Sequence, residues 1–358
     1  MKTTALLKRF IPYYRKYVWI MVMDLFCAGL TTICELVLPL ILRYITNVGM
    51  SDLASLTVQM VVTIGALYFV LRVIDGMASF YMAYTGHVMG AAIETDMRED
   101  AFEHLQKLSD NYFNNTKVGQ IMSRITSDLF DVTEFAHHCP EEFFIAFLKG
   151  AVSFVILARI NLLLTVIIFL LIPVMVVSCT YFNLQVRKAF KRQRNHIGEL
   201  NARIEDSLLG NKVVRAFANE KVEIDKFNHD NQEFLKIKRH TYKYMAAFQN
   251  TIRIFDGLMY VVVIVAGGIF MVDGRIAPGD LVAYTMYVTT LLATIRRIIE
   301  FAEQFQRGMT GVERFVELMD ASVDIFDEEG AAPLKDVEGE ITFNHVSFEY
   351  PDDHTPVL

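Results

Sequence analysis

The chain has 358 residues, of which 53% are hydrophobic, and its formal net charge is −7. This composition excludes an intrinsically disordered chain, which has few large apolar residues, and four cysteines in so long a chain exclude a disulfide scaffold. The acidic balance also argues against binding of nucleic acid, because such proteins carry an excess of basic residues. Very apolar stretches alternate with long charged ones, which is typical of a membrane protein with large aqueous parts.

The apolar stretches predict six membrane-spanning helices. A hydrocarbon core of ~30 Å needs about 20 apolar residues in a helix that rises about 1.5 Å per residue. Stretches close to this length cover residues 18–42, 56–83, 142–158, 162–182, 253–272 and 281–301. Before the first of them, about ten residues place apolar and basic side chains at helical spacing, which predicts a helix at the membrane surface. An ordinary amphipathic helix of a soluble protein is the alternative interpretation.

The distribution of lysine and arginine predicts the orientation. The three short connections each hold one arginine, namely Arg43, Arg159 and Arg275. The N-terminus and the two long connections are much richer in basic residues close to the span ends, and such segments stay in the cytoplasm. We therefore expect a multi-pass protein of the cell (inner) membrane with both termini cytoplasmic.

Two long connections are predicted to be helical arms. About 50 residues join spans two and three, and about 70 join spans four and five. Loops of this length without structure are uncommon, and both segments show helical periodicity with almost no proline. Asparagine and glycine at residues 111–119 and at Gly210 suit a turn or a helix end. The membrane helices are thus expected to extend into the cytoplasm as two pairs, each closed by a short tip.

The C-terminal segment shows a different pattern. Apolar and polar residues alternate over residues 341–350, which predicts one or two half-buried strands. The predicted fold class is therefore an all-α membrane protein with six transmembrane helices, long cytoplasmic helical extensions and a short β segment at the C-terminus.

Five motifs, in order along the chain, resemble those of ABC exporters of the six-span half-transporter type. They are Tyr112-Phe113 with Gly119, Arg124 and Asp128; Glu205 with Gly210, Arg215-Ala216-Phe217 and Glu220; Gly279-Asp280-Leu281; Glu313-Arg314-Phe315; and Gly339-Glu340-Ile341 with Tyr350-Pro351. The resemblance covers nearly the whole chain, and the ordered set is far more specific than any single motif.

The resemblance implies a domain organisation and partners. Residues 1–320 would form the transmembrane domain, residues 321–338 a linker, and residues 339–358 the start of a nucleotide-binding domain. Such a half-transporter works as a homodimer, or as a heterodimer with a second half-transporter, around one central cavity. Nucleotide-binding domains, membrane lipids and a small amphipathic substrate are the other expected partners, and nucleic acid is not one.

The resemblance also implies roles for particular residues. The arm tips, residues 111–120 and 210–219, would be short coupling helices that lie against the nucleotide-binding domains. The coupling residues carried over are Phe113, Gly119, Arg124, Asp128, Glu205, Gly210, Arg215, Phe217 and Glu220. Tyr350 would stack on adenine, but only in a complete nucleotide-binding domain.

No catalytic residue is predicted in the chain. Up to Leu358 there is no Gly-x4-Gly-Lys-Ser/Thr phosphate loop, no magnesium-binding acid after an apolar strand and no signature loop. We expect a chain cut just inside the second domain, which binds neither ATP nor Mg²⁺ by itself. Both cofactors, and ATP hydrolysis, are expected in the full-length protein.

Charged residues inside the spans indicate a cavity. A charge at mid-membrane costs several kcal/mol and usually faces a cavity or a partner. Glu35, Lys149, Arg296 and Arg297 are candidates for a substrate cavity that tolerates or prefers anionic groups. The alternative is that Arg296 and Arg297 reach the lipid headgroups. Arg72 and Asp75 are three residues apart and are expected to pair on one helix face.

A metal site is not predicted. His137 and His138 beside Cys139 hint at one, but nothing nearby in the sequence completes a tetrahedral ligand set.

The leading functional hypothesis is ATP-driven export of an amphipathic drug-like or lipid-like compound out of the cytoplasm or inner leaflet by alternating access. One alternative is a secondary transporter or channel driven by ion gradients, in which Asp24, Glu35 and Asp75 would relay protons. Another is a membrane scaffold that dimerises without transport. The arms and the terminal strand pattern have no role in a secondary transporter or channel.

Overall fold

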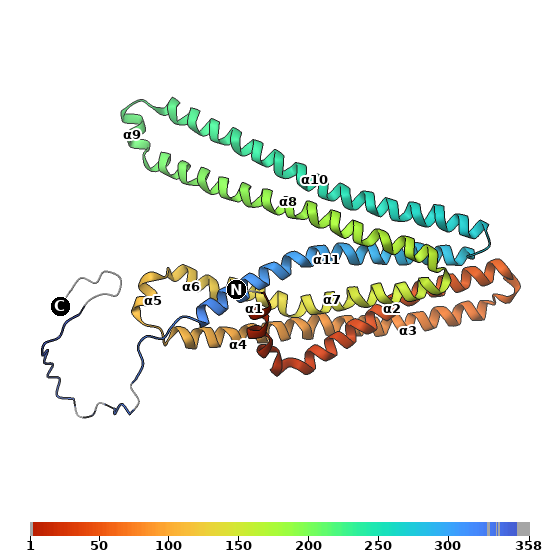
Figure 1. Cartoon of the computed structure of the whole chain (residues 1–358), viewed down its shortest axis with the longest axis horizontal. Helices are drawn as coiled ribbons and strands as arrows, with labels where there is room; N and C mark the ends of the chain where they lie inside the picture. The colour runs from red at the N-terminus through yellow and green to blue at the C-terminus, as the bar shows by residue number, and fades with distance from the viewer. Residues whose placement is uncertain (1–2, 328–329, 334, 336, 349–358) are drawn as a thin grey trace.

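The computed structural model describes residues 3–327, 330–333, 335 and 337–348, and Figure 1 shows a bundle of long helices. The α-helices are α1 (Thr3–Phe10), α2 (Val18–Ser51), α3 (Val58–Tyr81), α4 (His87–Leu105), α5 (Asp110–Asn115), α6 (Val118–Ile125), α7 (Ser127–Ile160), α8 (Leu162–Leu209), α9 (Asn211–Ala216), α10 (Glu220–Val272) and α11 (Pro278–Met319). Short 3-10 helices, η1 (Ile11–Tyr17) and η2 (Leu53–Ser55), flank α2, and a π-helical turn, η3 (Met82–Gly86), joins α3 to α4.

The helices are too long to lie in a membrane over their whole length. α8 has 48 residues, which at about 1.5 Å per residue gives about 72 Å, more than twice the ~30 Å hydrocarbon core. The predicted helical extensions are therefore confirmed. We call the end of the molecule that carries α5, α6 and α9 the arm end, and the end with the short α7–α8 and α10–α11 connections the turn end (Figure 1).

Five segments are long and apolar enough to cross a membrane: Thr3–Ser51, Val58–Leu105, Val118–Ile160, Leu162–Leu209 and Glu220–Val272. They support a multi-pass all-α membrane protein. The sixth predicted span, residues 281–301, lies in α11, which forms a 42-residue helix but is not among the five. Four threonines and the charged residues Arg296, Arg297 and Glu300 lower the hydropathy of this part of α11.

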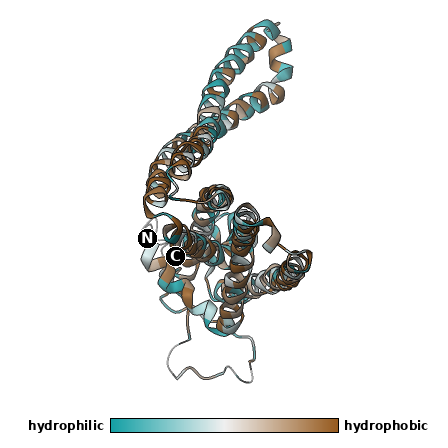
Figure 2. Ribbon diagram, turned by 90° about the vertical axis from the view of Figure 1, so that its right-hand side faces the viewer, coloured by the Kyte–Doolittle hydropathy of each residue, from teal (hydrophilic) through white to brown (hydrophobic). Residues whose placement is uncertain are grey.

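The helices form a bundle and a separate pair. α2, α3, α4, α7 and α11 pack together, whereas α8 and α10 pack mainly on each other. Both views show the α8–α9–α10 pair diverging from the bundle toward the arm end, where its residues become largely hydrophilic (Figures 1 and 2). The pair touches the bundle at the turn end, where α7 meets α8 and α10 meets α11.

Two buried clusters hold these parts together. The cluster at the arm end joins α1, α4, α6, α7 and α11, and the cluster at the turn end joins α2, α7, α8, α10 and α11. Small residues permit a close contact between α7 and α11. A Cβ atom at Gly311 would lie only 2.5 Å from the carbonyl oxygen of Asp128. Glycine is needed here because no larger residue leaves the helices at this separation.

The predicted C-terminal strands are not formed in the part that the structure describes. Residues 337–348 contain neither helix nor strand, and residues 349–350 of the predicted pattern lie outside the described residues. The physical reason is that a strand needs a partner for its backbone groups, and an isolated hairpin is marginally stable. Alternation alone therefore did not produce a strand in residues 341–348.

Candidate functional site

The first arm tip is fixed to the end of α11. It comprises α5 and α6, where Phe113, Gly119 and Arg124 lie, and α6 buries Ile121 in the arm-end cluster. Nη2 of Arg124 lies 3.4 Å from Oε2 of Glu317 in α11. At the start of α7, Oδ1 of Asp128 lies 2.9 Å from Nη1 of Arg314, also in α11.

The segment that follows α11 runs along the same arm. The hydroxyl of Ser109, just before α5, donates to Oδ2 of Asp324 at 2.8 Å. Nε2 of His104 lies 3.0 Å from the carbonyl oxygen of Ala321. The first tip and the chain that leaves the last helix are thus held together.

The second arm tip is exposed. α9 begins after Gly210 and ends before Phe217, whose side chain is 72% exposed. Ala218 turns the chain into α10 with φ of 52°, in the left-handed region. Exposed apolar residues cluster at this tip: Leu208, Leu209, Val213 and Phe217. Exposed apolar patches of this kind are typical of surfaces that contact a partner or a membrane.

The arm behind this tip is braced across its two helices. Nη1 of Arg203 in α8 lies 2.6 Å from Oδ2 of Asp230 in α10. Glu205 lies in α8, Arg215 in α9 and Glu220 at the start of α10, so these three predicted coupling residues flank the exposed patch. The predicted coupling residues therefore form two separate groups, one attached to α11 and one free of the bundle.

A polar cavity of about 490 Å³ lies inside the bundle, lined by α2, α3, η3, α4, α7 and α11. Three of the four predicted cavity residues line it, namely Glu35 of α2, Lys149 of α7 and Arg297 of α11. The predicted cavity set did not include Asp75 and His138, which the sequence had singled out for other roles, and sequence reasoning missed Glu141, Glu142 and His87. The polar run from His137 to Glu142 within an otherwise apolar helix was the available signal.

Both basic side chains of the lining are paired. Nζ of Lys149 lies 2.5 Å from Oε2 of Glu35, and the Arg297 guanidinium pairs with the carboxylate of Glu142, which is only 4% exposed. Of the four carboxylates in the lining, Asp75 pairs with Arg72 outside it, so Glu141 is the one without a basic partner among the described residues. This balance favours positively charged groups. The anion preference inferred from the sequence stays a prediction, and the pairing counts against it.

Arg296 points elsewhere. Its Nη2 lies 3.2 Å from Oδ2 of Asp256 in α10, and both residues line a different hollow of about 380 Å³. Arg296 and Arg297 therefore do not act as a pair in one cavity. The predicted Arg72–Asp75 pair is confirmed, with 2.9 Å between Nη1 and Oδ2.

The backbone of the cavity wall is irregular where α3 becomes α4. The π-helical turn η3 ends at Gly86, immediately before His87. A Cβ atom at Gly86 would lie 3.2 Å from Oδ1 of Asp24, a buried carboxylate oxygen with no hydrogen-bond partner among the described atoms. π-helical turns inside helices occur frequently at functional sites.

Comparison with known proteins assigns these features to a family. Residues 21–295 match the family of the ABC transporter transmembrane region. The chain is 33% identical over 353 residues to the uncharacterised ABC transporter ATP-binding protein YwjA of Bacillus subtilis (strain 168), with 99% of this chain and 61% of YwjA covered.

Two further relatives carry functional names. YgaD of the same organism, a candidate multidrug export ATP-binding/permease protein, is 26% identical over 355 residues, which cover 98% of this chain and 60% of YgaD. The ATP-dependent lipid A-core flippase of Syntrophus aciditrophicus (strain SB) is 24% identical over 286 residues, which cover 80% of this chain and 47% of the flippase. The chain thus spans about three-fifths of the length of YwjA and YgaD. It belongs to the family of ABC transporter transmembrane regions and forms the membrane half of an exporter-type ABC protein.

Proposed function

We propose that the chain forms the translocation pathway of an ATP-driven exporter that moves an amphipathic compound out of the cytoplasm or the inner leaflet. The observation that carries this proposal is the pair of helical arms, each ending in short helices: α5 and α6 on one, α9 on the other. A short rigid element on a long helix passes a rigid-body movement over tens of ångströms. In the full-length protein, a nucleotide-binding domain that binds ATP and Mg²⁺ would supply this movement.

We further propose that α11 is the sixth span and that both termini and both arms face the cytoplasm, in the inner membrane. Basic clusters at the arm side of the predicted spans support this orientation. The membrane domain would comprise residues 1–320, the linker residues 321–338, and the nucleotide-binding domain would begin at residue 339, with Tyr350 at the adenine.

We propose that two half-transporters, identical or different, form the working unit. The diverging α8–α9–α10 pair supports this, because its tip carries an exposed apolar patch that the described part of its own chain leaves uncovered. The second tip would dock on the nucleotide-binding domain of the other subunit through Phe217 and Arg215. The first tip, tied to α11 through Arg124 and Asp128, would follow its own subunit's domain.

For the substrate, we propose an amphipathic compound with a positively charged group. The excess of carboxylates in the cavity supports the charge, and the 490 Å³ volume suits a drug-sized molecule. Drug-like and lipid-like compounds both fall within this proposal.

The test uses the full-length protein in proteoliposomes. We expect ATP to drive accumulation of a lipophilic quaternary ammonium dye, and we expect the dye to stimulate ATP hydrolysis. A protonophore, which dissipates proton gradients, should leave this transport unchanged. Transport that needs a proton gradient and proceeds without ATP would overturn the proposal in favour of a secondary transporter. If the full-length protein hydrolyses ATP but does not transport the dye, the proposed substrate class is wrong.

A further inference from the structure

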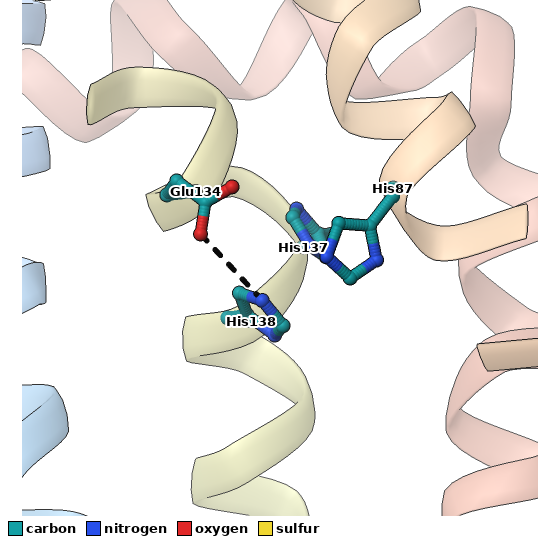
Figure 3. A group of neighbouring side chains, drawn as sticks. All are labelled: His87, Glu134, His137 and His138. Carbon is teal, nitrogen blue, oxygen red and sulfur yellow. Dashed lines mark ion pairs between the residues drawn. The ribbon is translucent and has the colours of Figure 1, made fainter. Parts of the chain in front are cut away.

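We propose that His87, Glu134, His137 and His138 bind one divalent transition-metal ion of the zinc type. His87 is the first residue of α4, and the other three lie on one turn of α7 (Figure 3). One ligand atom from each of the four lies within 4.8 Å of the others. This site does not rest on the proposed transport activity.

The four side chains provide a suitable ligand set. Three imidazole nitrogens and one carboxylate oxygen are donors that zinc prefers, usually in tetrahedral geometry. With metal–ligand bonds of about 2.1 Å, tetrahedral ligand atoms are about 3.4 Å apart. The observed spacing therefore needs only small side-chain rotations to close around an ion. The helical spacing of Glu134, His137 and His138 places all three on one side of α7.

His137 is held as a ligand would be. Its Nδ1 lies 2.9 Å from the carbonyl oxygen of Thr133 and donates a hydrogen bond to it. This bond leaves the lone pair on Nε2, and Nε2 is buried without a hydrogen-bond partner although the residue is only 2% exposed. An unpaired nitrogen in such a place is unfavourable unless something binds it. A metal-ligating histidine characteristically donates its other N–H to a carbonyl oxygen.

The neighbouring rings converge on the same point. The ring centroids of His137 and His138 are 4.0 Å apart, and that of His87 lies 4.4 Å from His137. Nδ1 of His138 is likewise buried without a partner, while its Nε2 lies 3.6 Å from Oε2 of Glu134. A histidine binds a metal ion through a neutral imidazole nitrogen, so three rings this close offer three such ligands to one ion.

The residues around the four side chains hold Glu134 in place and leave a path for an ion to enter. Nε2 of Gln304 donates to Oε2 of Glu134 at 3.2 Å, which fixes the carboxylate. A Cβ atom at Gly90 would lie 2.9 Å from Nδ1 of His137, so glycine allows α4 to approach α7 at this point. His87 is exposed, and both His87 and His138 line the polar cavity, which provides the entry path. A bound ion would join α4 to α7 beside the π-helical turn.

The experiment measures metal binding by the full-length protein, purified without a polyhistidine tag and treated with a chelator. Titration with Co²⁺ should give the intense visible absorption of tetrahedral cobalt at one ion per chain, and Zn²⁺ should abolish it by displacement. His87→Asn, His137→Asn and Glu134→Gln should each weaken Zn²⁺ binding at least about tenfold. His229→Asn is the matched control, because His229 is exposed on α10 far from the cluster.

Each outcome decides the proposal. Stoichiometric tetrahedral cobalt that is lost in the three variants and kept in His229→Asn supports it. Absence of tetrahedral cobalt, or the same affinity in wild type and all variants, overturns it. Size-exclusion profiles identify a variant that fails to fold. Glu134→Gln preserves the shape of the residue, so its binding decides the question if a histidine variant aggregates.

Discussion

Nε of Arg43 lies 2.5 Å from Oδ1 of Asp280, and this ion pair joins α2 to the start of α11 at the turn end. The same carboxylate accepts a hydrogen bond from the backbone N–H of Ala277 at 2.7 Å, which satisfies a free donor at the start of α11. Asn47 completes the join, because its Oδ1 accepts from the N–H of Gly279 at 2.8 Å. The Gly279-Asp280 motif noted in the sequence is thus a structural junction.

This junction predicts a stability effect. Asp280 is only 6% exposed, so Asp280→Ala removes an ion pair and an end cap together and leaves Arg43 unpaired. We expect a loss of about 2 kcal/mol, below the usual cost of breaking a fully buried pair because Arg43 is partly solvated. Thermal unfolding in detergent measures it. Asp273→Ala is the control, because its contact with Arg275 is longer, at 3.6 Å, and more exposed; equal losses would contradict the interpretation.

A second prediction concerns the contact between α7 and α11. Gly311→Ala places a methyl group within 2.5 Å of the carbonyl oxygen of Asp128, so the helices must separate. We expect a loss of about 1–3 kcal/mol, the usual cost of overpacking. Gly257→Ala, in α10, meets nothing within 4 Å and should leave the unfolding temperature unchanged or slightly higher. If Gly311→Ala left the unfolding temperature unchanged, the two helices would be able to separate without a loss of stability.

The sequence predicts much of the fold for a simple reason. The length of each apolar stretch and the helical period of the arms are local properties, and asparagine and glycine mark the positions where the arms turn. The extensions and the two tips therefore lie close to their predicted positions, while the resemblance to ABC exporters implied that the tips are short helices. The strands predicted at residues 341–348 are not confirmed, because a strand depends on a distant partner.

The cavity could be predicted only in part. Arg296 and Arg297 are adjacent in sequence, but successive helical residues point about 100° apart. One therefore pairs with Asp256 and the other with Glu142, and charge alone could not distinguish them. His87 and His137 are 50 residues apart in sequence, and their rings meet only because α4 packs against α7. No local pattern encodes that contact.

A third prediction separates coupling from folding. Phe217 is exposed at the second tip, so Phe217→Ala should change the unfolding temperature little, since it removes little buried surface within the chain. In the full-length protein we expect substrate-stimulated ATP hydrolysis to fall at least about tenfold, because the anchor of the proposed contact is lost. Val222→Ala, on the same arm beyond the tip, is the control. Unchanged stimulation in Phe217→Ala would remove this residue from the coupling contact.

The last prediction concerns charge in the cavity, where Lys149 is held against Glu35. Lys149→Met leaves the Glu35 carboxylate facing the cavity without its cation, whereas Glu35→Gln leaves Lys149 without its anion. At a partly solvated site, one such charge changes binding of a cationic probe by roughly 1 kcal/mol, or about fivefold. We expect Lys149→Met to lower the Kd of a quaternary ammonium dye and Glu35→Gln to raise it. Fluorescence titration of the full-length protein measures both, with an uncharged dye of similar shape as the control. Glu35→Gln would bind an acidic dye more tightly whichever charge the cavity prefers, so that result alone does not decide.

The decisive comparison is between the affinities of the wild-type protein for the cationic dye and for the acidic dye. A higher affinity for the acidic dye would contradict the proposed cation preference and support the anion preference predicted from the sequence.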